Sequence, residues 1–80
     1  MEIKFNNTQE ALKFGITATP EQIEFLRERM GKTQEHAMRL IDDGDLDAAS
    51  LVAFRAQLDR ESITAIQILA EHPEFARLLA

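Results

Sequence analysis

The sequence contains no cysteine, no tryptophan and no tyrosine, and only three glycines and two prolines. Without cysteine, neither disulfide bonds nor thiolate metal sites can stabilise the fold. At 80 residues, the chain is near the lower limit at which a hydrophobic core alone holds a domain together. We therefore expect one domain over residues 1–80, stabilised by close helix packing, by an oligomer or by a partner.

Basic residues are outnumbered by acidic ones, 9 against 14, so the formal net charge is −5. A nucleic-acid-binding domain needs a basic footprint to neutralise phosphates, so we expect no nucleic acid as a partner. The sequence shows no signal peptide and no run of about 20 apolar residues. The expected location is therefore cytoplasmic, with no membrane contact.

The first expected element is a short helix near the N-terminus. Asn7 stands three residues before Glu10, a spacing at which the two side chains can cap a helix over residues 8–14. Gly15 is expected to end this helix, because glycine takes the left-handed conformation most easily. Residues 1–18 are thus predicted to be an N-terminal segment with one short helix.

A capping box begins the first long helix. Thr19 can cap it, Pro20 has its φ angle preset for the first helical position, and Gln22 completes the box. Apolar residues then recur at intervals of three and four, with one polar member. This seam comprises Ile23, Leu26, Met30, Thr33, Ala37 and Leu40. The pattern predicts a helix over about 20–43 that packs one face against another helix.

A short acidic turn connects this helix to a second long one. Gly44 can supply the left-handed residue of the turn, and Asp45 can cap the next helix. That helix is predicted from about Leu46 to Glu71, because the residue before Pro73 avoids the helical region. So short a connection makes the two helices antiparallel.

The predicted fold is therefore all-α. It is a helical hairpin over residues 19–71, followed by a short helix over residues 73–80 that begins with Pro73. A second copy would turn the hairpin into a dimeric four-helix bundle.

The second long helix has more apolar surface than one partner helix can cover. Its two seams lie about a quarter-turn apart. The first comprises Leu51, Phe54, Leu58, Ala65 and Ile68 or Leu69, and the second comprises Val52, Ala56, Ile63, Ile66 and Ala70. One seam should pack on the first long helix. The terminal helices, a second copy or a different protein must cover the other, provided that the helix runs unbroken to residue 71.

These observations predict a non-enzymatic protein–protein interaction module, namely a small adaptor, chaperone or inhibitor that binds a partner protein or forms a homodimer. Phe25 lies about 100° away from the seam of its helix, so it is either covered by the N-terminal segment or a binding residue. The predicted interface comprises Phe25, Val52, Ala56, Ile63, Ile66 and Ala70. An acidic rim would favour basic surfaces on the partner. A purely structural, self-assembling bundle is an alternative.

Motifs for catalysis or metal binding are missing from the sequence. His36 and His72 have no further ligand at metal-binding spacing. The acidic turn does not fit a calcium loop, because Arg39 and Ile41 occupy positions that require oxygen ligands. There is no glycine-rich phosphate loop and no nucleophile–base set. We expect no metal, no cofactor, no small-molecule substrate and no enzymatic activity.

Ser50 gives one alternative from another class. The chain resembles acyl carrier proteins in its acidity, its length and a Ser-Leu pair near the start of an internal helix. Those proteins carry phosphopantetheine on the serine of an Asp-Ser-Leu motif, so the resemblance implies Ser50 as the modified residue. Here the tripeptide is Ala49-Ser50-Leu51, and Ser50 falls one turn inside the predicted helix. An unmodified surface serine is the preferred interpretation.

Overall fold

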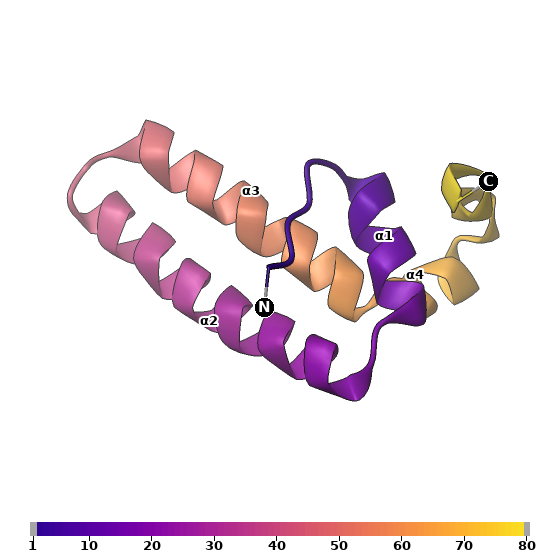
Figure 1. Cartoon of the computed structure of the whole chain (residues 1–80). Helices are drawn as coiled ribbons and strands as arrows, with labels where there is room; N and C mark the ends of the chain where they lie inside the picture. The colour runs from indigo at the N-terminus through magenta and orange to yellow at the C-terminus, as the bar shows by residue number, and fades with distance from the viewer. Residues whose placement is uncertain (1, 80) are drawn as a thin grey trace.

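The computed structural model describes residues 2–79, and within them the chain is all-helical, with no strand. The helices are α1 (Thr8–Thr17), α2 (Pro20–Asp42), α3 (Leu46–Ile63) and α4 (Ala65–Glu71), followed by the 3₁₀ helix η1 (Pro73–Leu79). The molecule is elongated and measures 40 × 26 × 20 Å (Figure 1). The predicted all-α class is confirmed. None of the helices in the described range is long and apolar enough to cross a membrane.

The predicted caps at the starts of α1 and α2 are present. The Asn7 side chain accepts a hydrogen bond from the Glu10 backbone NH at 2.9 Å, and Glu10 Oε1 accepts one from the NH of Asn6 at 2.9 Å. Thr19 and Gln22 make both halves of the capping box, at 2.8 and 3.2 Å. These contacts span three or four residues, so sequence spacing is enough to predict them.

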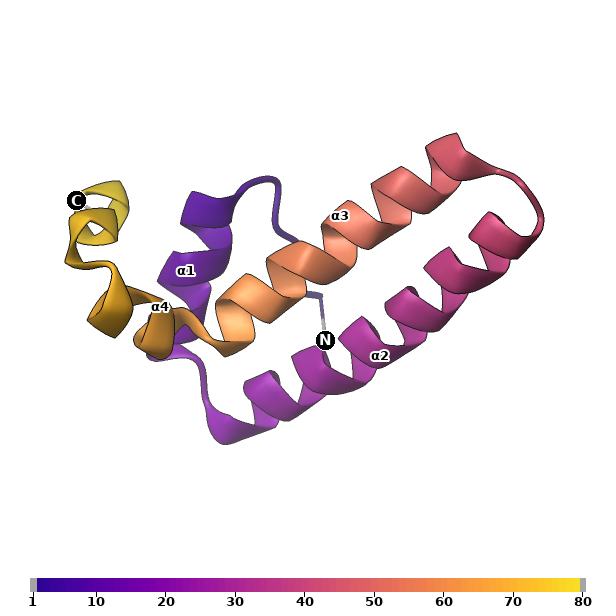
Figure 2. The same ribbon diagram turned by 180° about the vertical axis from the view of Figure 1, so that it is seen from behind.

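The chain reverses direction between α2 and α3, which then lie side by side over their length (Figures 1 and 2). Gly44 makes the reversal possible with a φ of 81°, in the left-handed region. Asp45 caps α3 by accepting a hydrogen bond from the Ala48 NH at 3.2 Å.

We expect Gly44→Ala to lower the free energy of unfolding by about 1–2 kcal/mol, because a left-handed backbone strains any residue with a β-carbon. No described atom lies within 4 Å of the added carbon, so the loss would come from the backbone alone. Gly44→Asn should lose less, since asparagine tolerates this conformation. Urea unfolding followed by circular dichroism measures both, and equal losses would contradict this explanation.

The predicted unbroken helix from Leu46 to Glu71 is wrong, because α3 ends at Ile63 and α4 begins at Ala65. Thr64 lies between them with φ −103° and ψ 17°, and its hydroxyl donates to the Arg60 carbonyl at 2.8 Å. Such bonds to the carbonyl four residues earlier tend to bend helices. Beyond the bend, α4 contacts α1. The two seams therefore do not run along one continuous rod.

The predicted end of the first helix at Gly15 is also wrong. Gly15 is buried within α1, which continues to Thr17. A β-carbon at Gly15 would meet the Ser62 carbonyl oxygen and come within 2.7 Å of Ala65 Cβ. Gly15 thus allows α1 to approach the junction of α3 and α4 closely. The helix ends before Thr19 instead, where the following proline disfavours helical backbone.

The core is thin and rich in alanine. Its buried apolar residues are Ile3, Ala11, Leu12, Leu26, Ala37, Ala49, Ala56, Leu58 and Ala65. α1 contacts both α3 and α4, and its Gly15 approaches Ala65, which belongs to the first seam of the predicted second long helix. The N-terminal segment and α1 lie on one face of the α2–α3 pair (Figure 1). The view from behind shows α2 and α3 with no segment crossing them (Figure 2).

Candidate functional site

The N-terminal segment, α2 and α3 border an open groove with a volume of about 760 Å³. Its apolar lining consists of Ile3, Phe5, Phe25, Val52 and Leu58. Its polar lining consists of Lys4, Asn6, Glu28, Arg29, Lys32, Thr33, His36, Arg55 and Asp59. Phe5 also packs edge-on against Phe14 of α1, with ring centroids 5.5 Å apart, which positions the N-terminal segment beside the groove.

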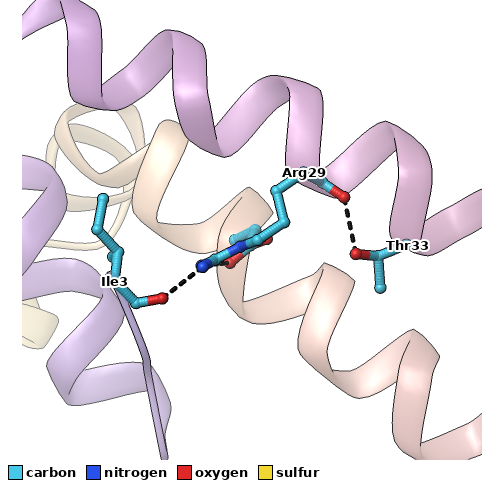
Figure 3. A network of polar contacts seen from close by, with 4 residues as sticks. Ile3, Arg29 and Thr33 are labelled. Carbon is cyan, nitrogen blue, oxygen red and sulfur yellow. Dashed lines mark hydrogen bonds and ion pairs between the residues drawn. The ribbon is translucent and has the colours of Figure 1, made fainter. Parts of the chain in front are cut away.

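A partly buried ion pair lies among the residues that line the groove, and Figure 3 shows how its arginine, Arg29, reaches Ile3. Arg29 donates to both carboxylate oxygens of Asp59, at 2.9 and 2.7 Å, and a third guanidinium nitrogen donates to the Ile3 carbonyl. The Asp59 side chain is 5% exposed and the Arg29 side chain 31%. Arg29 thus links the N-terminal segment, α2 and α3. Its guanidinium carbon also lies 5.4 Å from the centroid of the Phe25 ring.

The pairing of Arg29 with Asp59 was not predicted from the sequence, in which Asp59 only interrupts an apolar seam. The two residues are 30 positions apart, so no local spacing rule connects them. The sequence contains one indication of this pair. Arg29 and Asp59 carry opposite charges, and each lies beside the apolar seam that its helix is expected to turn towards the other helix. All three nitrogens of the Arg29 guanidinium already donate hydrogen bonds within the chain. We therefore assign Arg29 a structural role and not a role in binding a ligand.

Three other cations line the groove, namely Lys4, Lys32 and Arg55, and all three are exposed. The ion pairs within residues 2–79 are Arg29–Asp59 and His72–Glu74, so these cations have no acidic partner there. Four of the nine basic residues line the groove, against two of the fourteen acidic ones. The groove is therefore basic although the chain is acidic.

The six residues of the predicted interface do not form one surface. Phe25 and Val52 line the groove, and both are half-buried. Ala56 is buried and Ile63 is half-buried on α3, whereas Ile66 and Ala70 are exposed on α4. The separation follows from the break at Thr64, because α4 turns away from the axis of α3.

A second surface surrounds the α2–α3 turn. Among the described residues, the large apolar side chains that are at least half exposed are Met38, Ile41, Leu46, Leu51, Phe54 and Ile66. The first five lie close to the turn, on the last residues of α2 and the first half of α3. We call these five the apical patch. Leu51 and Phe54 belong to the first predicted seam, at the end that α1 does not cover.

The remaining candidate residues show no site for chemistry. Ser50 is exposed on α3, and His36 is exposed on α2. His72 lies 3.2 Å from Glu74 Oε1 and stacks on Phe75. Residues 2–79 hold no group of three or more acidic, histidine or cysteine side chains suited to a metal ion.

No protein-family model matches the chain, and no curated protein or solved structure matches it either. The groove and the apical patch are therefore the basis for a functional proposal.

Proposed function

We propose that this protein is a non-enzymatic protein-binding module that binds its partner through the apical patch. The proposal rests on five exposed apolar side chains that lie on the last turns of α2 and the first half of α3, on both sides of one chain reversal. Exposed apolar residues that gather in one region of a soluble protein mark an interaction site more often than single scattered ones do. Covering such side chains stabilises a complex by about 25 cal/mol per Å² of apolar area removed from water.

The surface area of the chain supports the same proposal. The accessible surface is 5631 Å² for a mass of 9.1 kDa. A compact monomer of that mass exposes about 4,900 Å². The excess of roughly 700 Å² follows from the elongated shape of the molecule and leaves surface available for an interface, of which a standard one buries ~800 Å² per partner. In this proposal α2 and α3 act as a helical hairpin that presents the patch at its tip.

The test is affinity capture from the cells in which the protein occurs, with the wild-type chain and two variants as bait. Leu51→Asp/Phe54→Asp places two charges in the apical patch, where they would oppose burial at an interface. Ile66→Asp is the control, because Ile66 is at least as exposed but lies on α4, away from the patch. We expect the wild type and the control to retain the same partner and the double variant to lose it.

Folding of the variants is checked by circular dichroism, because exposed positions usually change stability by no more than about 0.5 kcal/mol. If the double variant is folded and still retains the partner, the patch is not the binding surface. If no variant captures any protein, the binding function itself is contradicted.

A further inference from the structure

We propose that the partner of the apical patch is a second copy of this chain, and that the acidic α2–α3 turn of each copy docks into the basic groove of the other. This inference rests on the proposed function and adds the identity of the partner. Three features carry it: the charge of the turn, the charge of the groove and the position of the two on the molecule.

The turn carries two carboxylates that the isolated chain does not explain. It displays Asp42, Asp43, Asp45 and Asp47, all exposed, and none of them forms an ion pair within residues 2–79. Asp45 caps α3. Asp42 and Asp43 instead lie at the C-terminal end of α2, where the helix dipole disfavours negative charge. An external cation would remove this penalty.

Apolar side chains flank these carboxylates. Ile41 precedes the acidic turn and Leu46 lies within it, and both are more than half exposed. The turn thus protrudes from the molecule and carries both negative charge and two bulky apolar side chains. Its natural docking site is an apolar concavity with cations along the rim.

The groove has that composition. Lys4, Lys32 and Arg55 provide three exposed cations without acidic partners in the described chain, and Phe5 and Val52 provide half-buried apolar lining. Pairing the turn with the groove brings opposite charges together. Pairing turn with turn, or groove with groove, would bring like charges together, which opposes association. Electrostatics therefore selects the turn-to-groove contact among the ways two copies can meet.

The positions of the turn and the groove allow this contact to form twice. The groove lies midway along α2 and α3, on the face that carries the N-terminal segment, and the turn lies at one end of the same pair (Figure 1). Two copies with these faces opposed and their long axes antiparallel place each turn over the groove of the other. The result is a closed two-fold dimer, in which four long helices form a bundle.

The experiment measures molecular mass by sedimentation and light scattering at about 0.05 M and about 1 M NaCl, since salt screens exposed charges strongly at the higher concentration. The wild type is expected at twice 9.1 kDa in low salt, with a mass that falls towards 9.1 kDa in high salt. Lys32→Glu/Arg55→Glu reverses the charge of the groove. Asp42→Lys/Asp43→Lys/Asp47→Lys reverses the charge of the turn and keeps Asp45, which caps α3. Each should weaken self-association roughly tenfold or more.

Mixing the two reversed chains supplies the decisive result. Each turn then again faces a groove of opposite charge, so the mixture should form a heterodimer at concentrations at which each reversed chain alone is mainly monomeric. Lys13→Glu/Arg77→Glu is the matched control, because it makes the same change in net charge at exposed positions outside the groove. This control should dimerise like the wild type.

Several outcomes would overturn the inference: a wild-type monomer at both salt concentrations, reversed chains that dimerise like the wild type, or a mixture that stays monomeric. A monomer that still captures a different protein through Leu51 and Phe54 would overturn the self-association alone and leave the proposed function intact. A chain that neither dimerises nor captures a partner contradicts both.

Discussion

Replacing Gly15 by alanine should lower the free energy of unfolding by about 3 kcal/mol, because the new methyl group has no room. It would meet the carbonyl oxygen of Ser62 and lie 2.7 Å from Ala65 Cβ. A backbone oxygen cannot rotate away as a side chain can, so α1 must shift away from α3 and α4. For a chain of this length, whose total stability is about 4–12 kcal/mol, the loss is a large fraction.

Gly31→Ala is the matched control for this prediction. Gly31 also lies inside a helix, α2, but no described atom lies within 4 Å of the carbon that alanine would add. Alanine is the better helix former by about 0.8–1 kcal/mol, so this variant should be more stable than the wild type. Urea unfolding followed at 222 nm by circular dichroism measures both variants, since the chain has no tryptophan for fluorescence. Equal effects of the two substitutions would contradict the close approach of α1.

Arg29→Met should have a comparable or larger effect, about 3–5 kcal/mol, because it leaves the Asp59 carboxylate buried without its cation. The Asp59 side chain is only 5% exposed, so water cannot replace the guanidinium. The contact between Arg29 and the Ile3 carbonyl is lost as well, so the N-terminal segment should exchange its amide protons faster. Urea unfolding and hydrogen exchange are the two measurements.

Replacing Asp59 in place of Arg29 tests whether the unpaired buried carboxylate causes the loss of stability. Asp59→Leu should cost less than Arg29→Met, because the Arg29 side chain is 31% exposed and can regain water. The double variant Arg29→Met/Asp59→Leu should recover part of the stability lost in Arg29→Met, since an apolar pair avoids the unpaired charge. A double variant that loses the sum of the two single losses would show that the two side chains do not act as a pair.

Features of the fold that depend on neighbours in sequence were predictable. The caps at Asn7 and Thr19 and the left-handed turn at Gly44 follow from residue type and spacing over a few positions. Gly15 was assigned the wrong role because glycine serves two purposes. It can end a helix or permit close packing, and only the position of Ser62 distinguishes the two.

The break between α3 and α4 was missed for a similar reason. Thr64 makes a hydroxyl bond to the carbonyl four residues earlier, but Thr33 makes the same bond within α2 without interrupting it. The bond alone therefore does not break a helix. Contact of α4 with α1 is the additional factor, and it joins segments about 50 residues apart in the sequence.

The candidate sites were predictable only in part. Phe25 and Val52 were singled out by their apolar character, and the structure places both on the groove. The basic character of that groove was not predicted, because Lys4, Lys32 and Arg55 come from three separate segments. An acidic total charge gives no information about how the minority of cations is distributed in space.

The order in which the chain leaves the ribosome matters for α1. This ten-residue helix is synthesised before its docking site at Ser62 and Ala65, which follows it by about 50 residues in the sequence. Isolated helices shorter than about 12–15 residues are marginal in water. The Ile3 carbonyl likewise has its hydrogen-bond donor in place only after Asp59 holds the guanidinium of Arg29. The N-terminal segment and α1 therefore lack these stabilising contacts until Asp59, Ser62 and Ala65 have been synthesised.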